Sequence, residues 1–338
     1  MIVFISNFFN HHQVPLAEEL YRLTQGQYRF IEQVPMPDEF LKGGYPDYSD
    51  SPMLLQAWRG EAERREASRL TMEADIVIYG NILSYHDINR RLAMGKLTFE
   101  YGERWFKRGL LNLLSPRLLR SQWYYHTRHY RQPLYRLNSS AFAASDLSKM
   151  RSFRGKGFKW AYFTRVESID ADTIVRERQS YGKTRFISVA RLIPLKQIDH
   201  LIKACSILKN QGITDFETDL YGSGPEEGHL KSLIERLGLQ DHVTLRGNLP
   251  NDAMLAEMRK YDALVFCSNR KEGWGAVVNE AMSSACTVIG SNSIGSIPYL
   301  IKDGENGFIY TNGNVDMLAA KMKKLIESED LRMRLGIA

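Results

Sequence analysis

The chain has 338 residues, of which 43% are hydrophobic, and a formal net charge of +6. This length suggests about two domains, and the apolar fraction is large enough for two cores. The three cysteines, Cys205, Cys267 and Cys286, lie in helix or strand patterns without a paired spacing, which excludes a disulfide framework and indicates a reducing compartment. No stretch approaches the roughly 20 apolar residues that span a bilayer. We therefore expect a soluble, cytoplasmic protein.

The chain begins with an apolar run that predicts the first strand of a sheet. The run Ile2–Ser6 lacks the basic leader of a signal peptide and is too short for its core. His11 and His12 follow, and such a pair could suggest a metal. Adjacent side chains are expected to point apart, and no carboxylate or cysteine set completes a site. We therefore predict surface or hydrogen-bonded histidines and no metal.

Basic and aromatic residues are concentrated between residues 104 and 165. This window carries 14 Lys and Arg against one acid, Asp146, so the rest of the chain is net negative. Aromatic residues such as Trp105, Trp123 and Tyr130 are interleaved with the cations. This mix is typical of proteins on anionic membrane surfaces, where rings settle at the headgroup level. We predict a peripheral membrane patch; the mix could also serve nucleic acid, but no nucleic-acid module is recognisable.

A domain boundary is expected near residue 165. The run Leu137–Ala144 reads as a late strand with its turn, and Phe158–Phe163 as the last strand of the first domain. The polar stretch 164–183 then suits a solvated linker. The predicted domains are therefore residues 1–165 and 166–338.

Two buried-strand patterns in the second half end in residues suited to a ligand. The run Thr184–Ala190 is followed by two cations, Arg191 and Lys196, and then by a helix pattern. The run Phe216–Tyr221 ends in Gly222-Ser-Gly-Pro, where glycines let the backbone approach a ligand and proline suits a first helical turn. In open parallel sheets ligands bind at the carboxyl ends of strands.

The stretch from Glu272 to Glu280 is the most chemically informative part of the chain. It follows the apolar run Asp262–Cys267, and its glycines precede a predicted helix over 276–285. Free amides at a helix start attract phosphate. Each carboxylate can accept two hydroxyl hydrogens, so it suits a sugar diol. One phosphate and two diols describe a nucleotide sugar.

In this order and spacing, five motifs resemble the retaining glycosyltransferases of family 4, also called the group 1 glycosyl transferases. The motifs are Val189–Lys196 with Ile198–Ile202, Tyr221–Glu226, Val243–Pro250, Glu272–Glu280 and Asp303–Gly307. Any one of them alone would be a weak signal. Their common order over residues 184–310 is strong.

This resemblance implies an α/β protein of the GT-B type, with two Rossmann-like α/β/α domains whose parallel sheets face across a cleft. Residues 1–165 would bind the acceptor and residues 166–338 the nucleotide sugar. The family commonly adds a further helix that crosses back to the first domain. We therefore expect a short version of the second domain that lacks this helix.

The resemblance also implies roles for individual residues. Arg191 and Lys196 would hold the donor diphosphate without a metal, Glu280 would grip the ribose, and Glu272 would face the donor sugar. The residues expected to contact the donor are Gly222, Leu249, Gly273, Trp274, Gly275, Ala276, Val277 and Glu280. Taken alone, Arg191 and Lys196 could equally be solvated residues at a helix start, and Glu272 and Glu280 could be surface charges.

The family's histidine near the reacting sugar has no clear counterpart in this chain. Candidates from the first domain are His11, His12, His86 and Glu103, of which the last two lie at predicted strand ends. For Glu103, a salt-bridged helix start beside Lys107 explains the sequence equally well.

The function predicted by the resemblance is retaining transfer of a sugar from a nucleotide diphosphate sugar, such as a UDP- or GDP-sugar. The acceptor would be a lipid-linked glycan or glycolipid in surface polysaccharide assembly at the cytoplasmic face of the membrane. No cofactor or metal is expected. The alternatives are a GT-B nucleotide-sugar epimerase and a catalytically inactive nucleotide-sugar-binding scaffold.

Overall fold

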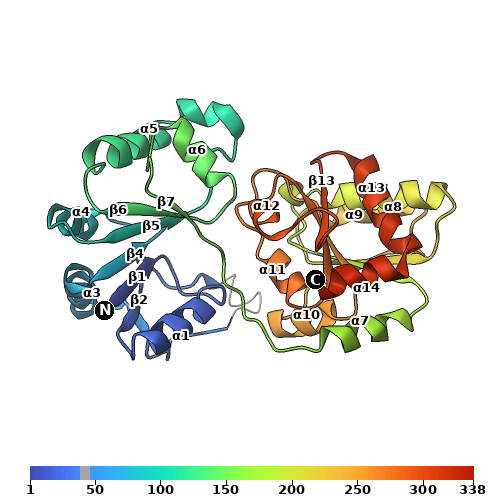
Figure 1. The fold of residues 1–338 in the computed structure, drawn as a ribbon, viewed down its shortest axis with the longest axis horizontal. Helices are drawn as coiled ribbons and strands as arrows, with labels where there is room; N and C mark the ends of the chain where they lie inside the picture. Colours follow the sequence, from blue (N-terminus) through green and yellow to red (C-terminus); the bar gives the residue numbers. More distant parts are fainter. Residues whose placement is uncertain (39–45) are drawn as a thin grey trace. The chain divides into compact units, whose positions relative to one another are not determined.

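A computed structural model describes residues 1–38 and 46–338 of the chain. The chain divides into two compact units, Met1–Arg165 and Val166–Ala338 (Figure 1). Each unit contains one sheet, and the strand pairs of both sheets are parallel. In the described residues, no helix has both the length and the apolar character needed to cross a membrane.

The sheet of the first unit has the strand order β3-β2-β1-β4-β5-β6-β7. Its strands are β1 Ile2–Ser6, β2 Tyr28–Glu32, β3 Leu54–Gln56, β4 Ile76–Tyr79, β5 Thr98–Gly102, β6 Leu134–Asn138 and β7 Gly157–Lys159. Its described helices and helical turns are α1 Val14–Leu23, α3 Glu61–Glu73, α4 His86–Ala93, η1 Gly109–Leu114, α5 Pro116–Gln122, η2 Trp123–Arg128 and α6 Ala143–Lys149.

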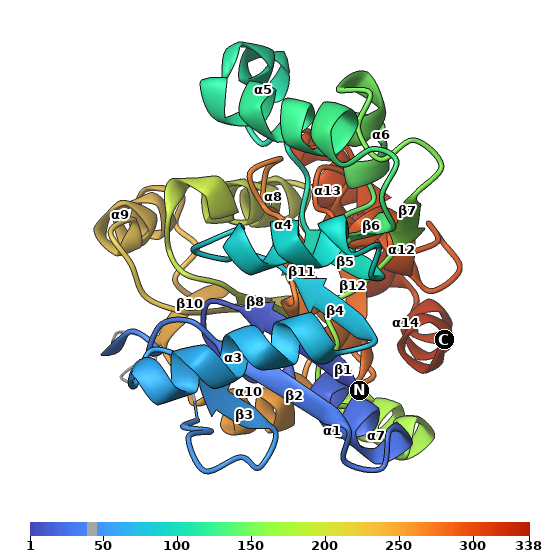
Figure 2. The ribbon, with the colours of Figure 1, turned by 90° about the vertical axis from the view of Figure 1, so that its left-hand side faces the viewer.

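Alternating residues of β1 send side chains into two different cores. Val3 and Ile5 pack on one face with residues of α3, α4 and α6, whereas Phe4 packs on the other face with Phe30 and α1. Figure 2 shows α3 and α4 lying across the sheet. The strand is apolar from Ile2 to Ile5 because a sheet covered on both faces buries the side chains of its central strands. The first predicted strand is therefore confirmed.

The sheet of the second unit has the strand order β10-β9-β8-β11-β12-β13. Its strands are β8 Thr184–Val189, β9 Phe216–Tyr221, β10 Val243–Gly247, β11 Ala263–Phe266, β12 Thr287–Ser291 and β13 Gly307–Tyr310. Its helices and helical turns are α7 Ala171–Gln179, η3 Pro194–Lys196, α8 Ile198–Asn210, α9 Glu227–Arg236, α10 Asn251–Met258, α11 Val277–Met282, α12 Ile297–Leu300, α13 Val315–Glu327 and α14 Glu329–Ile337.

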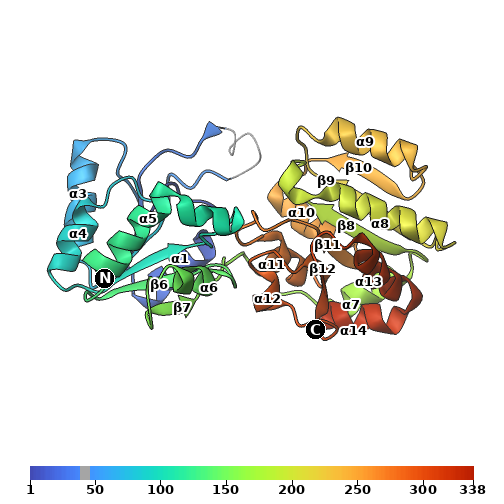
Figure 3. The same ribbon diagram turned by 90° about the horizontal axis from the view of Figure 1, so that it is seen from above.

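This second sheet is also covered on both faces. Phe186 of β8 joins the core beneath α8, α9 and α13, and its neighbour Ile187 joins the core with α10, α11 and α12. Figure 3 shows α8 and α9 side by side along the sheet. The strands predicted over 184–190, 216–221 and 262–267 are confirmed, as is the helix after Glu272.

The prediction of a solvated linker over 164–183 is only partly right, because residues 164–170 form a mostly exposed segment without helix or strand and a helix follows. Residues 171–179 form α7, whose first turn is capped by the Asp170 side chain, which accepts a hydrogen bond from the Thr173 amide at 3.1 Å. Arg178 is buried and donates to the carbonyl oxygen of Ala285 at 2.6 Å. The polar composition concealed this helix because only two of its residues are buried, Val175 and Arg178, and Arg178 binds backbone oxygens rather than extending an apolar stripe.

The strand predicted over 158–163 is also mostly wrong. β7 ends at Lys159, where it pairs with Asn138, the last residue of β6. Beyond this point the neighbouring strand offers no further ladder. Likewise, α6 begins at Ala143, inside the stretch expected to be a strand with its turn.

Candidate active site

Four neighbouring strands of the second sheet end in the loops that carry the predicted donor-binding residues. The strands β10, β9, β8 and β11 are adjacent and parallel, so their carboxyl ends lie at one edge of the sheet. Arg191 follows β8, Gly222 follows β9, Leu249 follows β10 and Glu272 follows β11. The edge of this sheet therefore collects residues that are up to about 80 positions apart in sequence.

The loops after β8 and β9 approach so closely that side chains cannot fit between them. Gly222 has φ +134°, and a Cβ atom there would lie 1.9 Å from the carbonyl oxygen of Ala190. Gly224 has φ +155°, and its Cβ would lie 2.4 Å from the carbonyl oxygen of Leu192. The glycines hold the loop that bears Arg191 against the end of β9.

Lys196 and Glu272 form an ion pair within this edge. Lys196 Nζ lies 2.5 Å from Glu272 Oε2, and the two side chains are 14% and 15% exposed. The ammonium also lies 5.0 Å from the centre of the Phe266 ring. A cation and a carboxylate predicted from separate motifs are thus held side by side in a largely dry setting, where each charge acts more strongly than in water.

Two further contacts, which sequence reasoning missed, tie the loop after β8 to the loops after β11 and β13. The Asn269 amide donates to the carbonyl oxygen of Leu195 at 3.0 Å. The Asn312 side-chain amide donates to Gln197 Oε1 at 2.8 Å, and Gln197 occupies the left-handed region with φ 49°. A strained non-glycine residue between Lys196 and α8 is a common mark of a functional loop, but positive φ cannot be read from a glutamine in a sequence.

The glycine-rich turn before α11 is fixed by packing. Gly275 has φ +86°, and a Cβ there would lie 2.5 Å from the Phe266 ring. The Trp274 side chain is 1% exposed and donates through Nε1 to Asn279 Oδ1 at 2.8 Å. The indole therefore packs in the core, so any contact of Trp274 or of the buried Gly273 with a ligand would involve backbone atoms.

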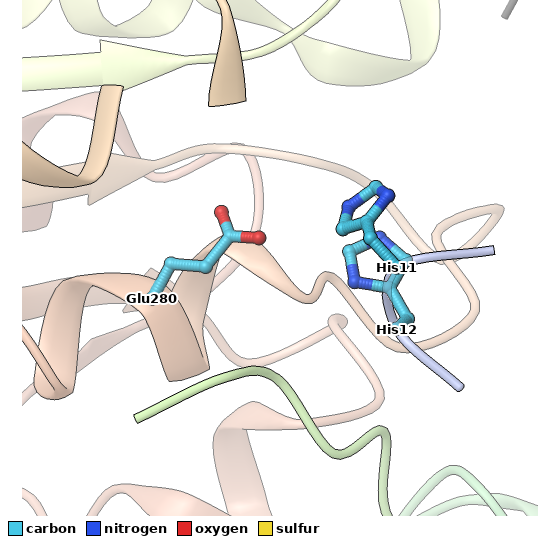
Figure 4. A group of neighbouring side chains, drawn as sticks. All are labelled: His11, His12 and Glu280. Atoms are coloured by element: carbon cyan, nitrogen blue, oxygen red, sulfur yellow. The ribbon is translucent and has the colours of Figure 1, made fainter. Parts of the chain in front are cut away.

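Glu280 is a buried carboxylate on α11, shown in Figure 4. Burial raises its pKa to about 7. A carboxyl group with such a pKa changes charge near neutral pH, so binding of a diol to the ionised form would release the carboxyl proton to solvent. Ala276 and Val277, at the start of the same short helix, are half-buried.

The remaining predicted donor residues of this unit are accessible. Arg191 is exposed, and no acid pairs with its guanidinium in the described parts of the chain. Leu249 is 38% exposed, and the loop that bears it is tied to the end of β9 by the Asn248 side-chain amide, which donates to Ser223 Oγ at 2.8 Å. The edge thus offers the exposed Arg191, the paired Lys196 and two carboxylates, and the loop after β11 adds the exposed Arg270 and Lys271.

In the first unit, the rings of His11 and His12 lie together, contrary to the prediction that they point apart. Their centroids are 3.8 Å apart at an angle of 50° (Figure 4). Both residues lie in a turn before α1, where the backbone does not alternate as it does in a strand. Burial, and then the neighbouring His11, lower the pKa of His12 to about 3, so its ring is neutral at physiological pH.

Glu103 lies at the end of β5 and is held by two donors. Its carboxylate accepts from the Tyr162 hydroxyl at 2.7 Å and from Lys107 Nζ at 2.5 Å. The pair with Lys107 was expected, but it lies in a turn before η1 rather than in a helix start. His86 is exposed at the start of α4.

His12 and Glu103, but not His11 or His86, lie among the described residues that line a cavity of about 1140 Å³ within the first unit. The cavity also contains the fully buried Arg136, which pairs with Glu100 and donates to the carbonyl oxygen of Glu103 at 2.9 Å. Sequence reasoning missed both this cavity and Arg136. A single arginine inside the apolar strand pattern of β6 was the available signal, because buried arginines are rarely without function or partner.

Comparison with known proteins identifies the family to which this chain is similar. The model of the family described as Glycosyl transferases group 1 matches residues 170–338. The amylovoran biosynthesis glycosyltransferase AmsK of Erwinia amylovora is 33% identical over 150 residues, which cover 43% of this chain and 36% of AmsK. This chain spans less than half the length of the curated relatives it matches.

Solved glycosyltransferase structures share the fold. The structure of Anabaena Alr3699/HepE in complex with UDP aligns with a TM-score of 0.68 and 16% identity, covering 99% of this chain and 92% of that one. WaaG, a glycosyltransferase involved in lipopolysaccharide biosynthesis, aligns with a TM-score of 0.63 and 16% identity, covering 100% and 93%. At these identities the likeness establishes the two-domain GT-B fold, which confirms the predicted fold class.

Proposed function

The chain belongs to the glycosyl transferases group 1 family, and from this premise we propose that it transfers a sugar from a nucleotide diphosphate sugar with retention at the anomeric carbon. The observation that carries the proposal is the 2.5 Å pair between Lys196 Nζ and Glu272 Oε2. The pair joins two of the five family motifs, since Lys196 ends Val189–Lys196 and Glu272 begins Glu272–Glu280. A site for a phosphorylated sugar needs such a cation beside such a hydrogen-bond acceptor.

In this proposal the second unit binds the donor. Arg191 and Lys196 contact the diphosphate, Glu280 accepts the ribose hydroxyls, and Glu272 contacts the donor sugar. The base lies near Leu249, and the backbone of residues 275–277 contacts phosphate and sugar. The UDP complex of the structurally similar HepE supports a uridine nucleotide as the first donor to test.

The proposed reaction is metal-independent. The bond between the anomeric carbon and the phosphate oxygen breaks, and the acceptor oxygen bonds to the same face of that carbon. The acceptor proton passes to a donor phosphate oxygen. Arg191 and Lys196 stabilise the negative charge that develops on the departing diphosphate, which is electrostatic catalysis at the point where charge grows.

The proposed acceptor is a lipid-linked glycan in the assembly of a surface polysaccharide. The likeness to AmsK of amylovoran biosynthesis and to WaaG of lipopolysaccharide biosynthesis supports this class. The basic window 104–165 would hold the enzyme on the cytoplasmic face of the membrane, since its turn η1 also exposes leucines such as Leu111 and Leu114. Flotation with anionic liposomes should recover the protein at low salt and not at high salt; no lipid-dependent flotation at low salt would contradict this part.

Turnover by Lys196→Ala tests the central role. We expect at least about a 100-fold loss of sugar transfer from the nucleotide sugar. Lys203→Ala is the matched control, because Lys203 is a half-exposed lysine of α8 that pairs with Asp199 at 2.7 Å. Circular dichroism of both variants verifies the fold. Near-normal turnover in Lys196→Ala would contradict the proposed role of Lys196 in sugar transfer. Conversion of free nucleotide sugar without acceptor would indicate an epimerase.

A further inference from the structure

The cavity of about 1140 Å³ in the first unit lies at the carboxyl ends of β1 and β5. All of its described lining residues belong to Met1–Arg165. At this volume it can accommodate a group as large as a phosphorylated sugar. The charge and polarity of the lining residues therefore indicate which ligands this unit can bind.

The carboxylates that line the cavity are already neutralised. Glu100 pairs with the buried Arg136, and Glu103 pairs with Lys107 at 2.5 Å. Among the described lining residues these are the only acids. The cavity therefore has no unpaired carboxylate with which to bind a cationic group.

Two of the lining cations have no such partner. Arg108 and Arg117 are both exposed, and neither forms an ion pair with any described residue. A third, Arg104, is largely buried and lies 3.3 Å from Asp146, outside the cavity. Guanidinium groups match the geometry of phosphate oxygens. The excess positive charge therefore favours a phosphate or diphosphate.

Apolar side chains lie between these two arginines in sequence. Leu111 and Leu114 belong to η1, line the same cavity and are 77% and 80% exposed. Large apolar groups with such exposure, beside unpaired cations, mark an interaction surface rather than a core. The juxtaposition fits a molecule that has an anionic head and an aliphatic chain.

We propose that this cavity binds a lipid-linked phosphate or diphosphate, with Arg108 and Arg117 on the phosphate oxygens and the lipid chain along Leu111 and Leu114. The inference rests on the proposed function, to which it adds the residues that hold the phosphate and the lipid chain of the acceptor. Binding of a single amphiphilic molecule is distinct from adsorption of the basic window 104–165 to a membrane surface, because it requires only the residues that line the cavity.

Calorimetric titration of the full chain with three probes tests the proposal. The probes are farnesyl diphosphate, which has head and chain, inorganic diphosphate, which has the head alone, and farnesol, which has the chain alone. We expect farnesyl diphosphate to bind at least tenfold more tightly than either of the others. The same titrations in Lys196→Ala should give unchanged farnesyl diphosphate affinity, because the cavity lies in the first unit.

The chain offers matched control variants for both halves of the proposed site. The double variant R108Q/R117Q should weaken farnesyl diphosphate binding at least tenfold, while R120Q/R131Q, which removes two cations outside the cavity lining, should leave it within twofold. The double variant L111S/L114S should likewise weaken binding. Its control is L110S/L113S, which alters the same turn at residues that do not line the cavity.

The outcomes separate the cavity from general adsorption. Equal weakening by lining and control variants would show a membrane-like surface effect and overturn the proposal. Farnesyl diphosphate binding no tighter than inorganic diphosphate would do the same. A parallel titration with UDP reports on the second unit, so UDP binding without farnesyl diphosphate binding would overturn this inference and leave the proposed function standing.

Discussion

The loops at the carboxyl ends of the two sheets differ in how they hold their charged side chains. In Val166–Ala338 the loops are locked by backbone, as at Gly222, and the central charges of Lys196 and Glu272 are paired at 2.5 Å with little exposure. In Met1–Arg165 a cavity of about 1140 Å³ is lined by side chains from many segments, including the unpaired Arg108 and Arg117.

This difference teaches which half of such a protein is readable from sequence. A rigid loop that approaches a ligand through backbone requires glycine at fixed positions, so its sequence is constrained. A cavity lined by side chains can change partner by changing those side chains, and the scaffold tolerates it. The sequence therefore reveals the loops of the second unit more readily than the cavity of the first.

Gly222→Ala should break the locked unit most severely. The new Cβ would lie 1.9 Å from the carbonyl oxygen of Ala190, and φ +134° is a region that alanine rarely adopts. We expect a loss of about 4 kcal/mol in the free energy of unfolding of the second unit. Urea denaturation measures it.

Gly228→Ala is the control for that variant. Gly228 lies in α9, and a Cβ there would meet no atom within 4 Å. Alanine should leave stability unchanged or raise it by up to about 1 kcal/mol. A Gly222→Ala protein as stable as this control would show that the two loops separate easily and that the locked description is wrong.

Glu280→Gln should change how stability depends on pH. Burial raises the pKa of Glu280 to about 7 from its ordinary value of 4.5, so the native state keeps a proton that the unfolded chain releases. This contribution is fully present below pH 4.5 and is lost as pH rises to about 7. The loss amounts to about 3 kcal/mol, and glutamine, which does not ionise, should not show it.

Urea denaturation at pH 5 and pH 8 tests this prediction. The wild-type protein should lose more stability between these two pH values than Glu280→Gln. Glu235→Gln, at an exposed position of α9, is the control and should keep the wild-type profile. An unaltered profile in Glu280→Gln would mean that the carboxylate is solvated rather than buried.

A double-mutant cycle on Lys196 and Glu272 should give a coupling of about 2 kcal/mol. Removing one partner leaves the other as an unpaired charge with about 85% of its surface covered. The losses of stability in the single variants Lys196→Met and Glu272→Gln should therefore add up to more than the loss in the double variant. Thermal unfolding of the four proteins measures the coupling. A coupling near zero would mean that the pair is solvated, as Arg108 and Arg117 of the first unit are.

The smallest effect is expected at the exposed leucines of the first unit. Leu111 and Leu114 are 77% and 80% exposed, so replacing both by serine should change the free energy of unfolding by less than about 0.5 kcal/mol. A large drop in thermal stability would show that these leucines contribute to a core. The expected difference in stability loss between this double variant and Gly222→Ala would then not be observed.

Sequence patterns were sufficient for the central strands and for the second unit's edge. Apolar runs such as 184–189 are buried on both faces, and the glycines after them mark close approaches. The helix α7 was missed because a side-chain cap and Arg178 hold it, neither of which produces an apolar period. The cavity could not be predicted, because its lining comes from segments that only the tertiary fold brings together.

The two histidines illustrate a different failure. Adjacent side chains point apart in a strand, but His11 and His12 lie in a turn, where their rings come within 3.8 Å. The local backbone conformation, which the sequence there does not specify, decided their geometry. Gln197, in the left-handed region without being glycine, escaped prediction for the same reason.

The most direct test of the account is calorimetric titration of the full chain with UDP, GDP and ADP, in EDTA and in magnesium, alongside Arg191→Ala. Arg191 is exposed, so its removal should not disturb the fold, and Arg236→Ala on α9 is the matched control. We expect one nucleotide to bind equally well in EDTA and in magnesium, and to bind at least tenfold more weakly to Arg191→Ala but not to Arg236→Ala. Binding of none of the three, or binding only with magnesium, would contradict it.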